Sequence, residues 1–66
     1  MEIGNLVITL VDKKTKERDI DVYIPANTEG VICDISPSCI LVEINTHELP
    51  EGIGVFAYDK KELKLI

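Results

Sequence analysis

Residues 31–44 read Val-Ile-Cys-Asp-Ile-Ser-Pro-Ser-Cys-Ile-Leu-Val-Glu-Ile. Apolar and β-branched residues dominate both ends of this stretch, and such residues favour strands. The intervening Ser36-Pro37-Ser38 is typical of a tight turn, because proline presets the backbone angle of the second turn position. The stretch therefore predicts an antiparallel hairpin with strands at 31–35 and 40–44.

One register of this hairpin collects six apolar side chains on a single face, and a slip of one residue would scatter them. The predicted inner residues are Val31, Cys33, Ile35, Ile40, Val42 and Ile44. The predicted outer residues are Ile32, Asp34, Leu41 and Glu43. Cys39 falls near the turn on the face opposite Cys33. Thiols on opposite faces cannot be bridged without moving the backbone, so we expect two free cysteines.

The remaining strands extend outward from this hairpin. The run 6–11 is apolar and rich in β-branched residues, and residues 19–24 alternate strictly between polar and apolar, with Tyr23 on the outer side. Residues 53–58 form a further strand with apolar residues on both faces, so either Val55 and Ala57 or Phe56 and Tyr58 face outward. Asp59 is expected to cap a single 3₁₀ turn before a short final strand at 63–66.

Two connecting segments lie between these strands. Residues 12–18 are polar and lack an apolar stripe, so they predict an exposed turn or long loop rather than a helix. Residues 24–30 form a turn that leads into the central hairpin. Gly30 is expected there to supply a β-bulge or a backbone angle that other residues resist.

The segment Ile-Pro-Ala-Asn-Thr-Glu-Gly-Val-Ile at 24–32 resembles the entry to the second barrel strand in small bacterial and phage SH3-like domains. The closing segment Tyr-Asp-Lys-Lys-Glu-Leu-Lys-Leu at 58–65 is similar to the end of those domains. The resemblance implies one all-β domain over residues 1–66, an SH3-like barrel of five to six short antiparallel strands. Asn27 stands where a glycine is common, and asparagine also tolerates left-handed geometry. Such domains are mostly non-catalytic binding modules.

The charge distribution bears on the partners. The 66 residues carry a formal charge of −5, and no lysine or arginine occurs between Val22 and Asp59. Nucleic-acid binding needs a basic surface, so the acidic middle of the chain argues against it. Mimicry of nucleic acid and contact with a basic protein surface both remain compatible with this charge.

Catalytic and metal-binding readings have little support in the sequence. His47 beside Glu48, with Glu43 and Glu51 nearby, is interpreted as a solvated loop because no nucleophile accompanies it. A structural zinc site needs four closely spaced ligands, and only His47 is available to join the two cysteines. We therefore expect no enzyme activity, no cofactor and no metal. The N-terminus lacks a basic segment followed by a long apolar run, so we expect a cytoplasmic protein.

These observations lead to a ranked set of functional hypotheses. The first is a non-catalytic protein-interaction module, of the kind that phages and mobile elements carry as accessory proteins, acting through an acidic and apolar face. Its predicted contact residues are Tyr23, Ile32, Asp34, Leu41, Glu43, Phe56 and Tyr58. The second is a binder of small anionic ligands or nucleotides, with the basic residues 13–18 at a subunit junction. Nucleic-acid binding or mimicry is the third. The surplus of apolar side chains also predicts a homo-oligomer.

Overall fold

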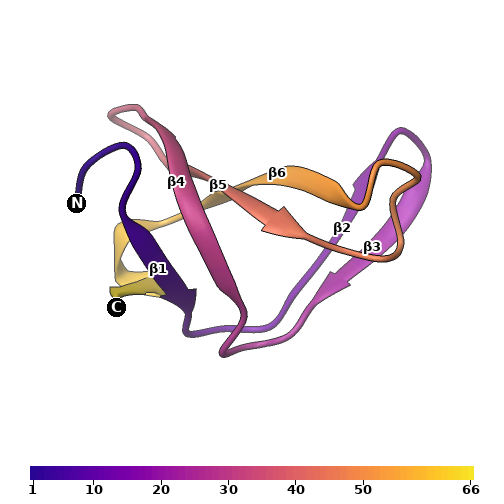
Figure 1. Cartoon of the computed structure of the whole chain (residues 1–66), viewed down its shortest axis with the longest axis horizontal. Coiled ribbons are helices and arrows are strands. Elements are labelled where there is room, and N and C mark those ends of the chain that lie inside the picture. Colours follow the sequence, from indigo (N-terminus) through magenta and orange to yellow (C-terminus); the bar gives the residue numbers. More distant parts are fainter.

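The computed structural model describes residues 1–66 and contains seven β-strands and one 3₁₀ turn (Figure 1). The strands are β1 (Leu6–Thr9), β2 (Lys13–Glu17), β3 (Ile20–Ile24), β4 (Glu29–Ile35), β5 (Ile40–Asn45), β6 (Ile53–Tyr58) and β7 (Leu63–Leu65). The turn η1 (Lys60–Glu62) directly precedes β7, and the Asp59 carboxylate caps it by accepting a hydrogen bond from Lys61 N–H at 3.2 Å. The all-β class and the capped turn are confirmed, whereas seven strands exceed the predicted five to six.

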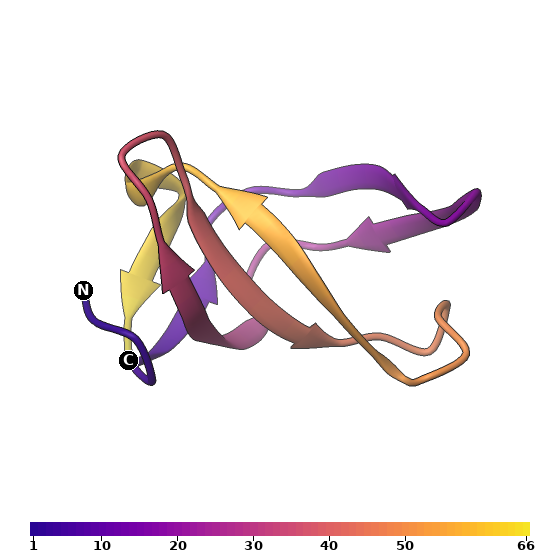
Figure 2. The ribbon, with the colours of Figure 1, turned by 90° about the horizontal axis from the view of Figure 1, so that it is seen from above.

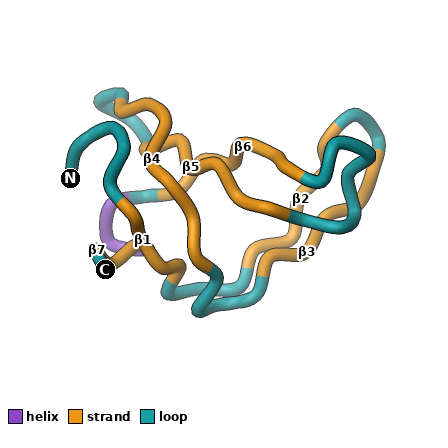
Figure 3. Tube along the Cα trace, viewed as in Figure 1, coloured by secondary structure: helices purple, strands orange, loops and turns teal.

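The strands form two antiparallel sheets. Five strands make one sheet in the order β6-β5-β4-β1-β7, and β2 pairs only with β3 (Figures 1 and 3). Because β6 and β7 end the larger sheet without pairing to each other, this sheet is not closed into a barrel. Seen from above, the β2–β3 hairpin and the loop between β5 and β6 extend to the same end of the molecule (Figure 2).

The prediction of a loop at residues 12–18 is wrong, because Lys13–Glu17 forms β2 and pairs with β3 along its whole length. Arg18 and Asp19 make the two-residue turn between the strands, with φ angles of 49° and 65°. Two consecutive left-handed residues are what a type I′ hairpin turn requires, although glycine and asparagine usually supply them. Lys13–Glu17 is entirely polar and becomes a strand because it pairs with the amphipathic strand β3.

A single apolar core lies between the inner face of the larger sheet and the hairpin. Its members are Val7, Val22, Ile24, Ile32, Ile40, Val42, Ile44, Leu49, Phe56, Tyr58 and Leu63. The hairpin contributes Val22 and Ile24, both 2% exposed, which confirms the alternation predicted for this strand. The hairpin thus covers the open sheet and supplies part of the core that a 66-residue chain needs.

The predicted phase of β4 is wrong. Ile32 is 1% exposed and lies opposite Val42, whereas Val31 is 36% exposed and lies opposite Glu43. A bulge between Ile32 and Asp34 then shifts the register. Val31 and Cys33 are consequently exposed, and Ile32 is in the core. Beyond the bulge Ile35 lies opposite Ile40, as predicted, although its side chain is exposed at the end of the strand. The prediction holds for β5, where Ile40, Val42 and Ile44 all face inward. Both cysteines are free thiols, as predicted. Cys33 was predicted on the inner face, but it is exposed.

The two alternatives for β6 are resolved in favour of its aromatic residues facing inward. Phe56 and Tyr58 are 3% and 1% exposed, whereas Val55 is 42% exposed. The larger aromatic side chains remove more apolar area from water when they are buried, so this orientation is the more stable one.

The turn that leads into β4 is held by buried Thr9. The Thr9 hydroxyl donates a hydrogen bond to Pro25 O at 3.1 Å and accepts one from Thr28 N–H at 3.0 Å. Asn27 adopts a φ of 69°, which confirms the expected left-handed geometry at this position.

Gly30 serves neither of its predicted purposes, since the bulge lies elsewhere and its φ is not positive. A Cβ atom at Gly30 would lie 2.5 Å from Val42 Cγ1 and 3.0 Å from Glu43 O. Both distances are shorter than ordinary van der Waals contact. Glycine is therefore required at this position because the Val42 and Ile44 side chains of β5 fill the space that a side chain would need.

Replacing Gly30 by alanine is expected to lower the free energy of unfolding by about 2 kcal/mol, because the added methyl overpacks the core beside Val42. Urea denaturation followed by circular dichroism measures this change. Val31→Ala is the matched control, since Val31 is adjacent but on the solvent side, and it should shift stability by less than about 1 kcal/mol. A Gly30→Ala variant as stable as the unaltered protein would contradict the packing argument.

Candidate functional site

A row of exposed side chains crosses four strands on the outer face of the larger sheet. Leu6 lies opposite Val31, Val31 opposite Glu43, and Glu43 opposite Val55. The three apolar residues are 55%, 36% and 42% exposed in the order Leu6, Val31, Val55. We define the outer row as Leu6, Val31, Glu43 and Val55. It is apolar except for one carboxylate near its middle.

The outer row borders a shallow hollow of about 320 Å³. Its lining combines apolar side chains, including Ile53, with the carboxylates of Glu29 and Glu43. No lysine or arginine belongs to it. Apolar contact area beside uncompensated negative charge matches a surface that presents apolar side chains together with lysine or arginine.

The structure brings together only some of the predicted contact residues. Asp34, Leu41 and Glu43 lie on neighbouring strands, with Asp34 and Glu43 exposed and Leu41 half-buried. Tyr23 is 45% exposed but belongs to the β2–β3 hairpin. The other three predicted contact residues, Ile32, Phe56 and Tyr58, belong to the core. The prediction that Ile32 faces outward is therefore wrong.

Three members of the outer row were not predicted as contact residues. The sequence predicts Val31 on the inner face, leaves the orientation of Val55 open and places Leu6 on neither face. The sequence carries no signal that places Leu6 outside, because residues 6–8 are all apolar and the polar residue of β1, Thr9, is buried.

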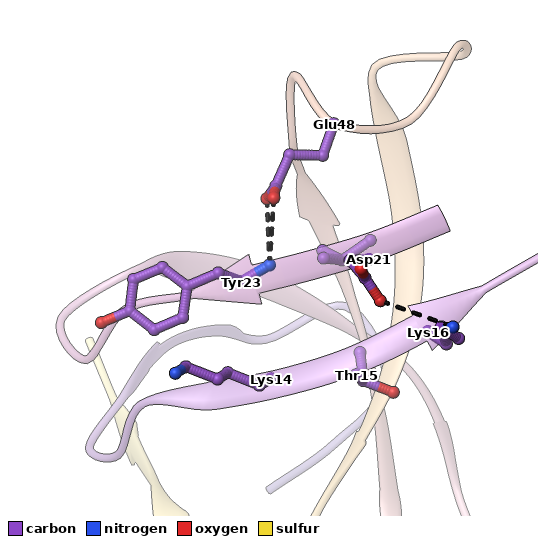
Figure 4. Close-up of a pocket in the computed structure, with 7 residues that line it drawn as sticks. Lys14, Thr15, Lys16, Asp21, Tyr23 and Glu48 are labelled. Carbon is purple, nitrogen blue, oxygen red and sulfur yellow. Dashed lines mark hydrogen bonds and ion pairs between the residues drawn. The ribbon is translucent and has the colours of Figure 1, made fainter. Parts of the chain in front are cut away.

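A second hollow, of about 470 Å³, lies between the hairpin and the β5–β6 loop (Figure 4). Its lysines belong to the segment 13–18 that was predicted to hold an anion. Lys16 Nζ lies 3.8 Å from the Asp21 carboxylate, and the Glu48 carboxylate accepts the Tyr23 N–H at 3.0 Å. The carboxylates of Asp21 and Glu48 offset the charges of Lys14 and Lys16, so the lining of this hollow has no net positive charge to attract an anionic ligand.

Two further cations of this segment, Lys13 and Arg18, also have partners. Lys13 Nζ lies 4.8 Å from the centre of the Tyr58 ring, a cation–π contact. The Arg18 guanidinium forms a bidentate ion pair with Glu51 in the β5–β6 loop, with Nη1 2.8 Å from Oε2. This ion pair lowers the pKa of Glu51, chiefly through its hydrogen bonds, and raises that of Arg18.

Tyr58 combines complete burial with an unpartnered hydroxyl. Its side chain is 1% exposed, and no protein group hydrogen-bonds to Oη. Loss of hydration, followed by the negative charge of Glu62, raises the pKa of Tyr58 to about 12. The phenol adds packing area to the core, while its oxygen lowers stability.

No group of three or more His, Cys, Asp or Glu side chains is arranged to hold a metal ion. The chain contains no helix with the length and apolar character needed to cross a membrane. No protein-family model, curated protein or solved structure matches this chain. The geometry of its own surfaces is therefore the basis for the functional argument.

Tyr58→Phe is expected to raise the free energy of unfolding by about 1 kcal/mol at neutral pH, because it removes a buried hydroxyl that has no partner. The unaltered protein should also lose stability more steeply than the variant between pH 10 and pH 12. In that range the unfolded tyrosine releases its proton while the folded one retains it. Urea denaturation at several pH values measures both effects, and a less stable Tyr58→Phe protein would contradict the first.

The Glu51 carboxyl is expected to titrate below its ordinary pKa of 4.5 in the folded protein. The ion pair with Arg18 should therefore stabilise the fold above this pH and lose its effect as the pH falls through the lowered pKa. Carbon-detected NMR titration of Glu51 measures the value, with Lys16→Ala as the control. Arg18→Ala should return the pKa toward 4.5, and an unchanged value would show that Arg18 is not the cause.

Proposed function

We propose that this protein is a non-catalytic interaction module that binds another protein through the outer row and the carboxylates beside it. The observation that carries the proposal is the alignment of Leu6, Val31 and Val55 with Glu43 across four strands. A regular sheet face holds these side chains in fixed positions, so little conformational entropy is lost when they are covered.

The size of the molecule is compatible with this role. A typical specific interface covers about 800 Å² on each partner. The whole chain exposes 4388 Å², so such an interface would use roughly a fifth of its surface. The outer face of a five-stranded sheet is the broadest regular surface that the chain offers.

The charge of the surface supports a partner that presents apolar side chains together with lysine or arginine. Glu29 and Glu43 lie beside the outer row, and the chain carries a net charge of −5. The same charges oppose the approach of phosphates, so a basic protein surface fits better than nucleic acid. Cytoplasmic accessory proteins of phages and mobile elements are the class in which we place this module.

A relationship with SH3-like barrels forms part of the proposal. It is supported by the order of the elements, with a 3₁₀ turn directly before the last strand. The left-handed Asn27 in the segment that resembles the SH3-like entry also supports it. Coverage of the open sheet by the β2–β3 hairpin gives the core a barrel-like enclosure without a closed ring of strand pairs.

Val31→Lys and Glu43→Lys are expected to reduce binding of the partner at least tenfold, because each places a cation where a basic and apolar surface docks. The measurement is quantitative affinity capture from the native host, followed by titration of the identified partner. Binding should also weaken as salt is raised.

Tyr23→Lys is the matched control, since Tyr23 is similarly exposed but lies on the hairpin. It should keep full binding. Circular dichroism checks that each variant is folded. If all three variants bind the partner as tightly as the unaltered protein does, the outer row is not the interface.

A further inference from the structure

The two sheets have four open edges, and three of these are protected against pairing with another strand. At the end of the larger sheet, β7 is only three residues long and carries Lys64. Three of the five residues of β2 are lysines. On β3, the Glu48 carboxylate already accepts the outward Tyr23 N–H (Figure 4). Short length, lysines and occupied donors are the usual means by which proteins prevent edge pairing.

The fourth edge, β6, has none of these protections. Its six residues, Ile-Gly-Val-Phe-Ala-Tyr, include no charged residue and no proline. Ile53 and Val55 are 38% and 42% exposed, and Ala57 is also exposed. A long apolar edge without a charge is a template for a further strand.

The backbone groups that β6 offers follow from its pairing with β5. Thr46 N–H donates to Gly52 O at 3.0 Å, which sets the phase of the antiparallel ladder. Bonded and non-bonded pairs alternate, so Gly54, Phe56 and Tyr58 direct their backbone groups to β5. Ile53, Val55 and Ala57 direct theirs to the open edge.

This edge is complementary to itself. In an antiparallel pair of two β6 strands centred on Val55, each Ile53 lies opposite Ala57 of the second copy. All three outward residues are then used, which gives about six backbone hydrogen bonds. Phe56 lies opposite Gly54 of the second copy, where the absence of a side chain leaves room for the ring. Registers centred elsewhere leave at least one outward residue unpaired.

We propose that β6 binds β6 of a second copy of this chain, so that two five-stranded sheets join into one sheet of ten strands. The contact is isologous and therefore closes at two copies. The contact is made by backbone groups at the edge of the sheet, and Val55 is the one residue of the outer row that takes part in it. This proposal therefore does not depend on the proposed partner interface.

Sedimentation equilibrium from micromolar to millimolar concentrations tests the pairing. The unaltered protein should form dimers, and Val55→Pro should raise the dissociation constant at least tenfold because it removes a donor at the centre of the contact. The Val55 N–H has no role in the β5 ladder, so the variant keeps its own sheet. Val55→Lys, which places two cations together at the symmetry axis, is a second variant with the same expected result.

Val31→Lys is the control that separates the two proposals. It should reduce binding of the partner at least tenfold and leave dimerisation unchanged. Salt also separates them, because two copies of charge −5 repel each other and should associate more tightly as salt rises. Amide exchange should slow at Ile53, Val55 and Ala57 as dimers form. The proposal is overturned by a monomer at every concentration, by a dimer that both Val55 variants retain, or by fast exchange at these amides in the dimer.

Discussion

Buried hydrogen bonds around Thr9 attach the hairpin to the larger sheet. The chain leaves the sheet after β1 and returns before β4, and Thr9 bonds Pro25 and Thr28 across this gap while fully buried. The Asp12 carboxylate adds a bond to Ala26 N–H at 2.8 Å. Leaving a buried polar group such as the Thr9 hydroxyl without a hydrogen-bond partner costs about 1–3 kcal/mol. Because the two crossing segments are held together, Val22 and Ile24 remain over the inner face of the sheet and complete the core.

The fold could be predicted from the sequence where apolar alternation is strict. It is strict in β3 and β5, whose inner residues were assigned correctly. In β4 the alternation is ambiguous, because Val31 and Ile32 are adjacent and the inner position before them is Gly30. Glycine has no side chain, so the pattern of apolar residues does not reveal that Gly30 faces inward. The bulge between Ile32 and Asp34 then removed the regular spacing on which the predicted register relied.

The candidate site was less predictable, because it depends on which strands become neighbours. Glu43 and Leu41 were expected on an outer surface, but the alignment of Leu6 with Val31 joins segments 25 residues apart in the chain. The identity of the edge strands follows from sheet order, which local pattern does not contain. β2 was missed for a related reason: its lysines form a strand only because β3 pairs with them, through a turn at Arg18 and Asp19 that lacks the usual glycine.

The open edge and the outer row meet at Val55, which belongs to both. In a pair joined at β6, the row of one copy would continue through the two Val55 residues into the row of the other, forming one apolar stripe with two Glu43 carboxylates. A partner with two basic and apolar segments could then contact both copies, and its second contact would form at a high effective concentration. The outer edges of such a pair would be β7, with its three residues and Lys64. Strand addition would therefore end at two copies, and the acidic faces would keep successive pairs apart.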